Sequence, residues 1–283
     1  MAEDFKVLKD FPLSATVACQ GIAGAFSETA AERLFKIPNL VYVAKFKDVF
    51  KVVDNGHADY GILPIENSNA GSVTEVYDLF KSYKFFIVSA VKLPVEHNLL
   101  GIQNTKIEDI KEIYTHHMAE KQCSKFLEHH PNIKVILSPN TAESAKFVSN
   151  SGRKDIASIS SKKCANIYNL STLKQNIQDS DNNRTRFICI SKKFEVYENA
   201  NKISIMLTLE HKAGALFNII KLFAENGLNL TKLESRPIMG SDFEFMFYFD
   251  LEGNLCNKTV RNLIKKLKTA VPYFLLLGNY KEL

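Results

Sequence analysis

The amino-acid sequence predicts an α/β protein in two parts, an alternation of strands and helices followed by a ferredoxin-like βαββαβ unit. Three observations support this fold class. The chain has 283 residues, 46% of them hydrophobic, which is enough for two domains of roughly 150 residues. Apolar runs of strand length alternate with helical patterns up to residue 195, as in mainly parallel sheets covered by helices. The pattern then resets to strand, helix, strand, strand, helix, strand.

Composition and charge argue against several classes of protein. The net charge of +5 is spread along the chain without a run of five like charges, so we expect no nucleic-acid or membrane partner. The five cysteines are far apart and form no Cys-x-x-Cys pair, which is typical of free thiols in a reducing compartment. The start of the chain lacks the pattern of a signal peptide, and no apolar stretch approaches the ~18 residues of a membrane span. We therefore expect a cytoplasmic protein.

The first predicted strand, Ala15–Cys19, ends in a loop with two glycines. Ser27 is predicted to cap the helix that follows, whose apolar residues fall near one face. Such a loop directs backbone N–H groups at whatever lies above the helix start, which favours an anion. The alternative is a tight turn without a ligand, and the spacing matches neither a dinucleotide-binding fingerprint nor a P-loop.

A polar cluster follows the next predicted strand. A helix is expected over Lys47–Asn55, and the strand after it ends in Glu66-Asn67-Ser68. Another helix begins after Gly71-Ser72. Polar groups at the carboxyl end of a strand lie where open α/β sheets bind ligands, although turn chemistry alone would also account for Asn67 and Ser68.

The alternation continues to the end of the first part. Further strands are expected at Phe85–Val91, Val95–Ile102, Glu112–Thr115, Lys134–Leu137 and Asp155–Ile159, and helices at Met118–His130, Thr141–Asn150 and Ser160–Tyr168. A break near Val91–Pro94 favours two sheets over one.

The segment Asp181–Ile190 runs from polar residues into an apolar strand. Two of the six arginines in the chain, Arg184 and Arg186, flank Thr185 there. Arginine binds carboxylates and phosphates through two parallel hydrogen bonds, so this spacing indicates an anion site. A solvated loop before a strand is the alternative.

The second part has its own predicted core. Its strands are expected at Ile203–Leu209, Leu228–Arg236, Phe243–Asp250 and Tyr273–Tyr280, and its helices at Gly214–Glu225 and Lys258–Lys268. The alternating phenylalanines from Phe243 to Phe249 are interpreted as one buried face of a sheet.

Four motifs in order resemble those of one family. They are Pro64-Ile65-Glu66-Asn67-Ser68 with Gly71-Ser72-Val73, then Asn183-Arg184-Thr185-Arg186-Phe187, Gly214-Ala215-Leu216, and Glu234-Ser235-Arg236-Pro237. From about Ala15 to Tyr280 the chain resembles prephenate dehydratase joined to a C-terminal ACT regulatory domain. The resemblance implies a catalytic domain at residues 1–195 with two lobes similar to periplasmic binding proteins, and an ACT domain at residues 196–283. Lobe one would span about 15–92 and 178–195, and lobe two about 93–177.

The resemblance implies an enzyme of phenylalanine biosynthesis, a carbon–oxygen lyase that converts prephenate to phenylpyruvate without cofactor or metal. Thr185 would be the catalytic hydroxyl and Arg186 would hold the pyruvyl carboxylate of the substrate. The other implied substrate-binding residues are Asn67, Ser68, Thr115, Gln122 and Ser27. Glu66 is interpreted as structural and Arg184 has no assigned role. Two alternatives remain, an arogenate dehydratase that yields phenylalanine directly and a non-catalytic amino-acid sensor.

The chain departs from the family pattern at four positions. Ile22 and Ala25 stand where proline and threonine are common, and His117 and Met118 replace proline and glutamine. The adjacent pairs His116-His117 and His129-His130 diverge on a strand or helix, so they are interpreted as surface histidines and not as metal ligands. Cys123 and Cys189 are interpreted as small buried hydrophobes.

The C-terminal match implies a phenylalanine-binding module that inhibits the enzyme. The residues expected to bind phenylalanine are Gly214, Ala215, Leu216, Glu234, Ser235, Arg236 and Pro237. Because ACT modules commonly pair their sheets side by side, the resemblance also implies a homodimer or homotetramer.

Overall fold

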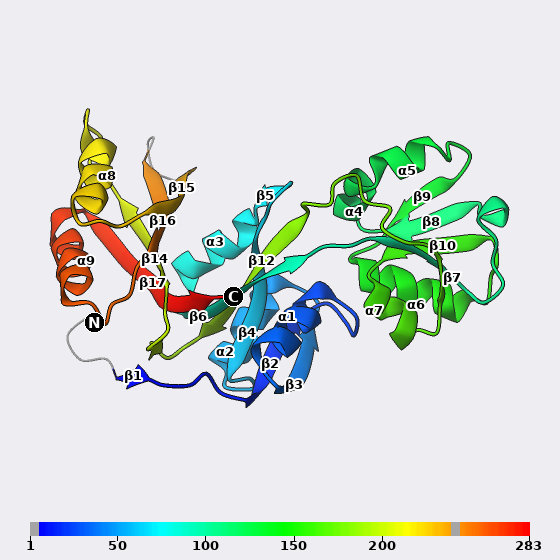
Figure 1. Ribbon diagram of the computed structural model, residues 1–283, viewed down its shortest axis with the longest axis horizontal. Coiled ribbons are helices and arrows are strands. Elements are labelled where there is room, and N and C mark those ends of the chain that lie inside the picture. The colour runs from blue at the N-terminus through cyan, green and yellow to red at the C-terminus, as the bar shows by residue number, and fades with distance from the viewer. Residues whose placement is uncertain (1–5, 239–243) are drawn as a thin grey trace. The chain divides into compact units, whose positions relative to one another are not determined.

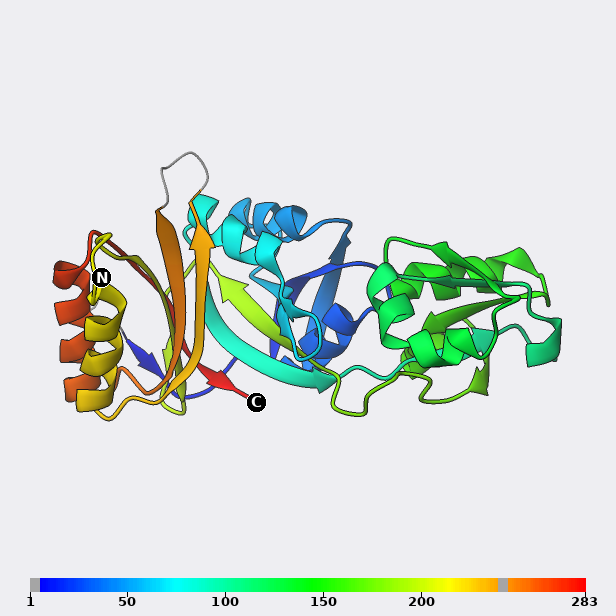
Figure 2. The same ribbon diagram turned by 90° about the horizontal axis from the view of Figure 1, so that it is seen from above.

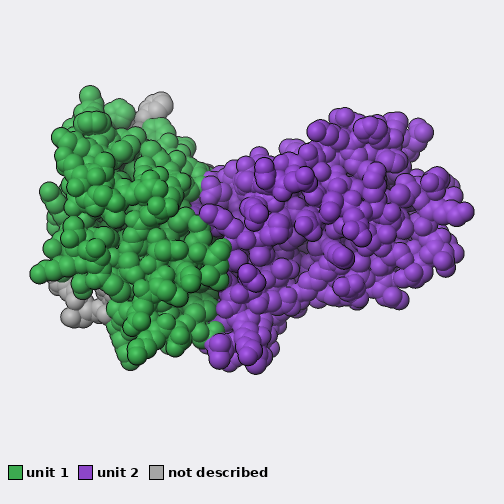
Figure 3. Space-filling model, viewed as in Figure 1, with its two compact units in different colours: residues 1–12, 83–90, 188–283 green, residues 13–82, 91–187 purple. Residues whose placement is uncertain are grey.

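The computed structural model describes residues 6–238 and 244–283, which fall into two compact units (Figure 3). The larger unit comprises residues 13–82 and 91–187, and the smaller unit comprises residues 1–12, 83–90 and 188–283. Strands and helices alternate in the first and follow the order βαββαβ in the second, so the predicted α/β fold class is confirmed. Residues 83–90 and 188–195 group with the C-terminal part. The predicted domain and lobe limits stay predictions.

The first sheet of the larger unit brings strand ends next to helix starts (Figure 1). Its neighbour order is β12-β4-β2-β3, formed by β2 (Ser14–Gln20), β3 (Ile37–Val43), β4 (Tyr60–Asn67) and β12 (Arg184–Ser191), of which residues 184–187 belong to the larger unit. β5 (Gly71–Ser72) pairs with β4, and the helices are α1 (Phe26–Leu34), α2 (Phe46–Asp54) and α3 (Thr74–Ser82). β3 was not predicted, because Pro38 and Asn39 interrupt its apolar pattern. As an edge strand it tolerates proline.

The second sheet has five strands with helices on both faces. Their order is β11 (Ser171–Lys174), β7 (Asn98–Gly101), β10 (Ile156–Ser160), β8 (Glu112–Thr115) and β9 (Lys134–Leu137). The helical elements are η1 (Ile107–Asp109), α4 (His117–Gln122), α5 (Ser124–Glu128), α6 (Thr141–Ser151) and α7 (Lys162–Ile167). Leu99 packs in the core that includes α4 and α5 residues, whereas Leu100 packs in the core that includes α6 and α7 residues. Successive side chains of one strand thus serve two cores.

The predicted single helix from Met118 to His130 is wrong, because the chain forms α4 and α5 with a break at Cys123. The Asp179 carboxylate accepts hydrogen bonds from the Ser124 and Lys125 backbone N–H groups, each at 3.0 Å. A carboxylate at this position satisfies the free donors of a new helix start. Asp179 lies 55 residues from Ser124 in sequence, so the local pattern does not reveal the break.

The smaller unit contains the predicted βαββαβ order. Its elements are β14 (Lys202–Thr208), α8 (Ala215–Glu225), β15 (Leu230–Pro237), β16 (Phe245–Glu252), α9 (Lys258–Ala270) and β17 (Tyr273–Glu282). The helices α8 and α9 lie side by side on one face of the sheet (Figure 2), and the core between them and the sheet includes Ile203, Phe223 and Leu263. β17 pairs with Ser89 and Ala90 in the middle of β6 (Phe86–Pro94), and β1 (Val7–Leu8) pairs with β13 (Val196–Tyr197).

The prediction of a single buried face on the phenylalanine-rich strand is wrong. Phe249 packs in the core below the helices, but Tyr248 and Asp250 on the opposite face of β16 are buried as well. Ser204 Oγ donates to the Asp250 carboxylate at 2.5 Å and lies 2.7 Å from the Tyr280 hydroxyl, so polar groups on that face have partners. Phe243, the first residue of the predicted strand, lies outside the described residues.

Candidate active site

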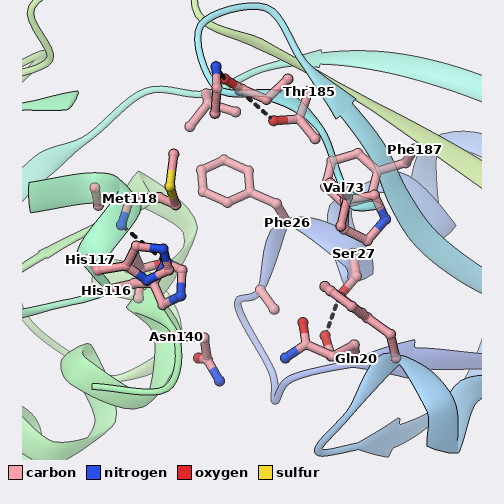
Figure 4. Close-up of a pocket in the computed structure, with 18 of the residues that line it drawn as sticks. Gln20, Phe26, Ser27, Val73, His116, His117, Met118, Asn140, Thr185 and Phe187 are labelled. Carbon is pink, nitrogen blue, oxygen red and sulfur yellow. Dashed lines mark hydrogen bonds between the residues drawn. The ribbon is translucent and has the colours of Figure 1, made fainter. Parts of the chain in front are cut away.

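The larger unit contains a cavity of about 890 Å³, and all residues that line it belong to this unit (Figure 4). Both sheets contribute to it through the loops that precede their helices. Phe26, Val73, Met118 and Phe187 provide apolar surface, and polar side chains lie between them. A cavity of this size with a few convergent polar groups is the usual form of a small-molecule site.

Four helices of nine or more residues begin at the cavity wall. Lining residues lie at the starts of α1 (Ala25–Ser27), α2 (Ala44–Phe46), α3 (Ser72–Glu75) and α6 (Pro139–Thr141). A helix N-terminus carries about half a positive elementary charge and N–H groups without intrahelical partners. In the described part of the chain no side chain caps α1 or α2, whereas Asn140 caps α6. The cavity therefore favours an anionic ligand.

The charged and titratable side chains around the cavity are few. Lys45 is the one lysine or arginine among the lining residues, and Glu75 is the one carboxylate. Burial lowers the pKa of His97, and burial together with His117 and His97 lowers the pKa of His116 to about 4. Both imidazoles are therefore neutral near pH 7.

His117 is exposed, as predicted, whereas His116 is half-buried, and both line the cavity. They follow β8, and the chain turns there into α4, so His116 lies at the N-cap and its Nδ1 accepts from the Met118 N–H at 3.4 Å. Among the residues that the structure describes, no group of three metal-binding side chains comes together.

Strand β12 presents alternate side chains to the cavity. Thr185 and Phe187 line it, whereas Arg186 lies on the other face of the strand and is 6% exposed. The Nε atom of Arg186 is 3.5 Å from Oε2 of Glu66. The predicted contact between Arg186 and substrate is therefore not supported, because strand alternation directs its guanidinium away from the cavity.

The Asn67 side chain connects Thr185 to the loop that follows β4. Its Oδ1 accepts hydrogen bonds from the backbone N–H groups of Asn69 at 3.0 Å and Ala70 at 2.9 Å. This fixes the amide orientation, and Nδ2 donates to Thr185 Oγ1 at 2.9 Å and to Asn183 Oδ1 at 2.8 Å. Because the Thr185 oxygen accepts this bond, its own hydrogen is available for donation into the cavity.

The same network continues from Asn183 to Gln122 and His97. Asn183, which is 2% exposed, donates through Nδ2 to Gln122 Oε1 at 2.9 Å. Gln122 Oε1 also lies 2.9 Å from His97 Nε2. Sequence reasoning assigned no role to Asn183 or His97, although Asn183 lies in a segment that resembles the family. Their partners are 25 to 116 residues away in sequence, so only the fold brings them together.

Ser68 and Thr115 are predicted site residues whose hydroxyl groups form hydrogen bonds within the protein. Ser68 lies outside the cavity lining, where its Oγ donates to the Asn182 carbonyl at 2.8 Å and accepts from the Arg184 N–H at 3.0 Å. Thr115 is fully buried and donates to the Ile159 carbonyl at 3.3 Å, so its predicted contact with substrate is not supported.

Ser27 does line the cavity, but it does not cap the helix. α1 begins at Phe26 with Ala25 at the N-cap position, and Ser27 Oγ donates to the Gln20 carbonyl at 2.5 Å. The two cysteines near the site are buried, as predicted, and burial raises the pKa of Cys123 to about 12.

The residues predicted to bind phenylalanine lie at two places in the smaller unit. Gly214 occupies the N-cap of α8 with φ 82°, and Ala215 and Leu216 form the first turn of that helix. Glu234, Ser235, Arg236 and Pro237 end the edge strand β15. Only glycine adopts such a φ without strain, which explains this residue type at the start of α8.

These features define a class of protein, an α/β enzyme with two sheets around an anion-binding cavity and a C-terminal ferredoxin-like unit. The family model for prephenate dehydratase matches residues 17–195. Arogenate dehydratase/prephenate dehydratase 1 from Arabidopsis thaliana is 36% identical over 280 residues, which cover 93% of this chain and 71% of that protein. The chain therefore belongs to the prephenate dehydratase family, carbon–oxygen lyases of phenylalanine biosynthesis, and the predicted resemblance is confirmed.

Solved structures show the same likeness over nearly the whole chain. Prephenate dehydratase from Arthrobacter aurescens, in complex with L-Phe, has a TM-score of 0.85 and 28% identity and covers 94% of this chain and 89% of that one. GqqA, described as a novel type of quorum quenching acylase, has a TM-score of 0.84 and 27% identity over 94% of this chain and 97% of that one. The likeness extends past residue 195, so it includes the βαββαβ unit.

Proposed function

We propose that this chain converts prephenate to phenylpyruvate in the cavity of the larger unit, with the Thr185 hydroxyl as the donor to the leaving oxygen. The observation that carries the proposal is the hydrogen bond from Asn67, which makes the Thr185 oxygen an acceptor and directs its hydrogen elsewhere. The four helix starts at the cavity wall support an anionic substrate. Prephenate has two carboxylates and a ring hydroxyl, so it matches both features.

The reaction removes carbon dioxide and water from one ring. The bond between the ring and its carboxylate breaks, and its electron pair enters the ring as the bond to the hydroxyl oxygen breaks. Hydroxide leaves and takes up one proton from the buffered solvent to become water, and the ring becomes aromatic. Aromatisation supplies the driving force, so a hydrogen bond to the departing oxygen and a fixed substrate orientation are the main tasks of the protein. Threonine is a poor acid at neutral pH, so Thr185 acts as a hydrogen-bond donor.

Lys45 and the starts of α1 and α2 take the role that we first predicted for Arg186. Lys45 lines the cavity directly before α2, and no hydrogen bond or ion pair joins its side chain to the described part of the chain. The carboxylate that departs must lose its charge to the ring, so a strong ion pair there would hold it back. Lys45 therefore holds the pyruvyl carboxylate, which stays in the product.

The ring chemistry is the same for arogenate, which carries an amine in place of the pyruvyl keto group. The Arabidopsis relative is named for both substrates. Among the described residues, no carboxylate other than Glu75 lines the cavity to pair with an amine, and Glu75 is exposed on the first turn of α3. This favours prephenate, and an arogenate dehydratase remains the second candidate.

Feedback control by phenylalanine belongs to the same proposal. The βαββαβ unit, the free helix start at Gly214 and the edge strand β15 support an effector site at these two motifs. The similar enzyme from Arthrobacter aurescens is a complex with L-Phe. Inhibition requires that phenylalanine bind one of two states more tightly. We further propose a cytoplasmic homodimer or homotetramer paired through this unit.

The decisive test uses the purified chain with prephenate and, separately, arogenate. We expect phenylpyruvate from prephenate at neutral pH, and less of it when phenylalanine is added. Phenylalanine formed only from arogenate would replace the proposal with the second candidate. If neither product forms while calorimetry shows phenylalanine binding, the chain is an amino-acid sensor.

A further inference from the structure

His97 is a buried histidine that takes no part in the proposed bond-breaking steps. It is 2% exposed, lies between β6 and β7, and reaches the cavity wall. Its backbone N–H donates to Gln178 Oε1 at 2.9 Å, and its carbonyl accepts from the Ile177 N–H at 2.9 Å. These two hydrogen bonds fix the backbone of His97. The ring Nε2 lies 2.9 Å from Gln122 Oε1.

The orientation of Gln122 follows from backbone donors at the far end of the network. The N–H groups of Asn69 and Ala70 can only donate, so Asn67 turns its oxygen to them and its nitrogen to Asn183. Asn183 then accepts with its oxygen and donates with its nitrogen to Gln122. A reversed amide at any of these residues would place two donors or two acceptors against each other.

Gln122 therefore presents its oxygen to two donors, Asn183 Nδ2 and His97 Nε2. This assigns the hydrogen of the neutral His97 ring to Nε2. His97 Nδ1 is buried and has no partner in the described part of the chain, so a proton there would leave a buried donor unsatisfied. The ring can serve only as a neutral donor.

The Nε2 group of Gln122 takes no part in this network. It makes no hydrogen bond to the described residues, and the side chain lines the cavity. We propose that His97 is a positioning residue, which holds the Gln122 oxygen so that the Gln122 N–H groups face the substrate. This inference rests on the proposed function, and it adds a neutral donor for a substrate oxygen. A neutral donor orients the dianion without fixing its charge on the departing group.

The test is a double-mutant cycle on the full chain, with turnover of prephenate as the readout. We expect His97→Leu to lower kcat/KM about 10- to 100-fold, since it leaves the Gln122 amide free to turn. Gln122→Ala should cause a loss of similar size. Because His97 acts through Gln122, the double variant should be no worse than Gln122→Ala. If the losses in kcat/KM of the two single variants multiply in the double variant, the proposal is wrong.

A conservative variant separates positioning from packing. His97→Gln places an N–H group the same number of bonds from Cβ as His97 Nε2, so it should keep kcat/KM within a few-fold of the parent. An equal loss for His97→Gln and His97→Leu, at matched thermal stability, would contradict the inference. His57→Leu is the matched control, because His57 is exposed and outside the cavity lining.

A spectroscopic measurement keeps the inference testable if the chain does not turn over prephenate. Nitrogen-15 NMR of labelled histidine should show neutral His97 with its hydrogen on Nε2 near neutral pH. A hydrogen on Nδ1, or a doubly protonated ring, would contradict the network. Failure of turnover with the Nε2 form present would reject the proposed function and leave the positioning of Gln122 intact.

Discussion

The smaller unit and the cavity of the larger unit are held together in different ways. In the smaller unit, the regular order β14 to β17 follows from strand and helix periods that are visible in the sequence, and one apolar core joins the two helices to the sheet. At the cavity, three hydrogen bonds from Asn67 and Asn183 join residues 116, 118 and 61 positions apart. The local sequence pattern therefore specifies the order of strands and helices, whereas long-range hydrogen bonds position the polar side chains at the cavity.

The largest effect is expected from removal of the Thr185 hydroxyl. Thr185→Val keeps the shape of the side chain and loses the donor, so we expect kcat to fall at least about 100-fold with little change in KM. Thr185→Ser should retain much of the activity, because it keeps an oxygen that accepts from Asn67. Steady-state kinetics on prephenate measures both. A normal kcat for Thr185→Val would remove Thr185 from the mechanism.

The second test keeps the shape of the Asn67 side chain and removes its donor, which serves Asn183 and the Arg184 carbonyl as well as Thr185. Asn67→Asp still accepts from Asn69 and Ala70, but a carboxylate cannot donate to Thr185. Thr185 would then donate to Asp and not to the leaving oxygen, and we expect kcat to fall about 10- to 100-fold.

Asn69→Asp is the matched control for this variant. It adds the same charge two residues away, on an exposed side chain outside the lining of the main cavity. Equal effects of the two variants would show that repulsion of the dianion, and not the direction of the hydrogen bond, limits the rate.

The same contrast explains what sequence reasoning could predict. The α/β class, the βαββαβ order and the presence of Asn67, Gln122 and Thr185 at the site follow from periodicity and from motifs that resemble the family. Arg186 was misplaced because a motif gives residue types in order, whereas the face of a strand decides which side chain meets the ligand.

Other errors at the site have related causes. Thr115 and His116 are neighbours in sequence, yet Thr115 is fully buried at the end of β8 and His116 lines the cavity. The turn from β8 into α4 separates them, and its direction depends on how α4 packs against the second sheet. No local sequence pattern indicates the hydrogen bonds that run from Asn183 through Gln122 to His97.

A smaller effect is expected from substitution of Lys45, the residue proposed to hold the pyruvyl carboxylate. Lys45→Met should raise the KM for prephenate about 10-fold and leave kcat nearly unchanged, because one ion pair to a carboxylate is lost in ground state and transition state alike. Lys47→Met is the control, since Lys47 is exposed on the same helix and does not line the cavity.

Product inhibition shows which carboxylate Lys45 holds. Phenylpyruvate keeps the pyruvyl carboxylate, so its inhibition constant should rise in Lys45→Met by the same factor as KM. A higher KM with an unchanged inhibition constant would assign Lys45 to the departing carboxylate and would require another holder for the product.

The smallest expected change concerns the smaller unit, where the comparison predicts an effect on control and none on chemistry. Gly214 has φ 82° at the start of α8, and apart from its chain neighbours a Cβ there would meet no atom of the described residues within 4 Å. Gly214→Ala therefore adds only backbone strain of about 1–2 kcal/mol, which tends to shift the first turn of the helix. We expect phenylalanine inhibition to weaken about five-fold while kcat and KM for prephenate stay at parental values.

Gly227→Ala, with φ 68° after the same helix, is the matched control for strain. If both variants weaken inhibition equally, strain in the unit is responsible and Gly214 is not at the effector site.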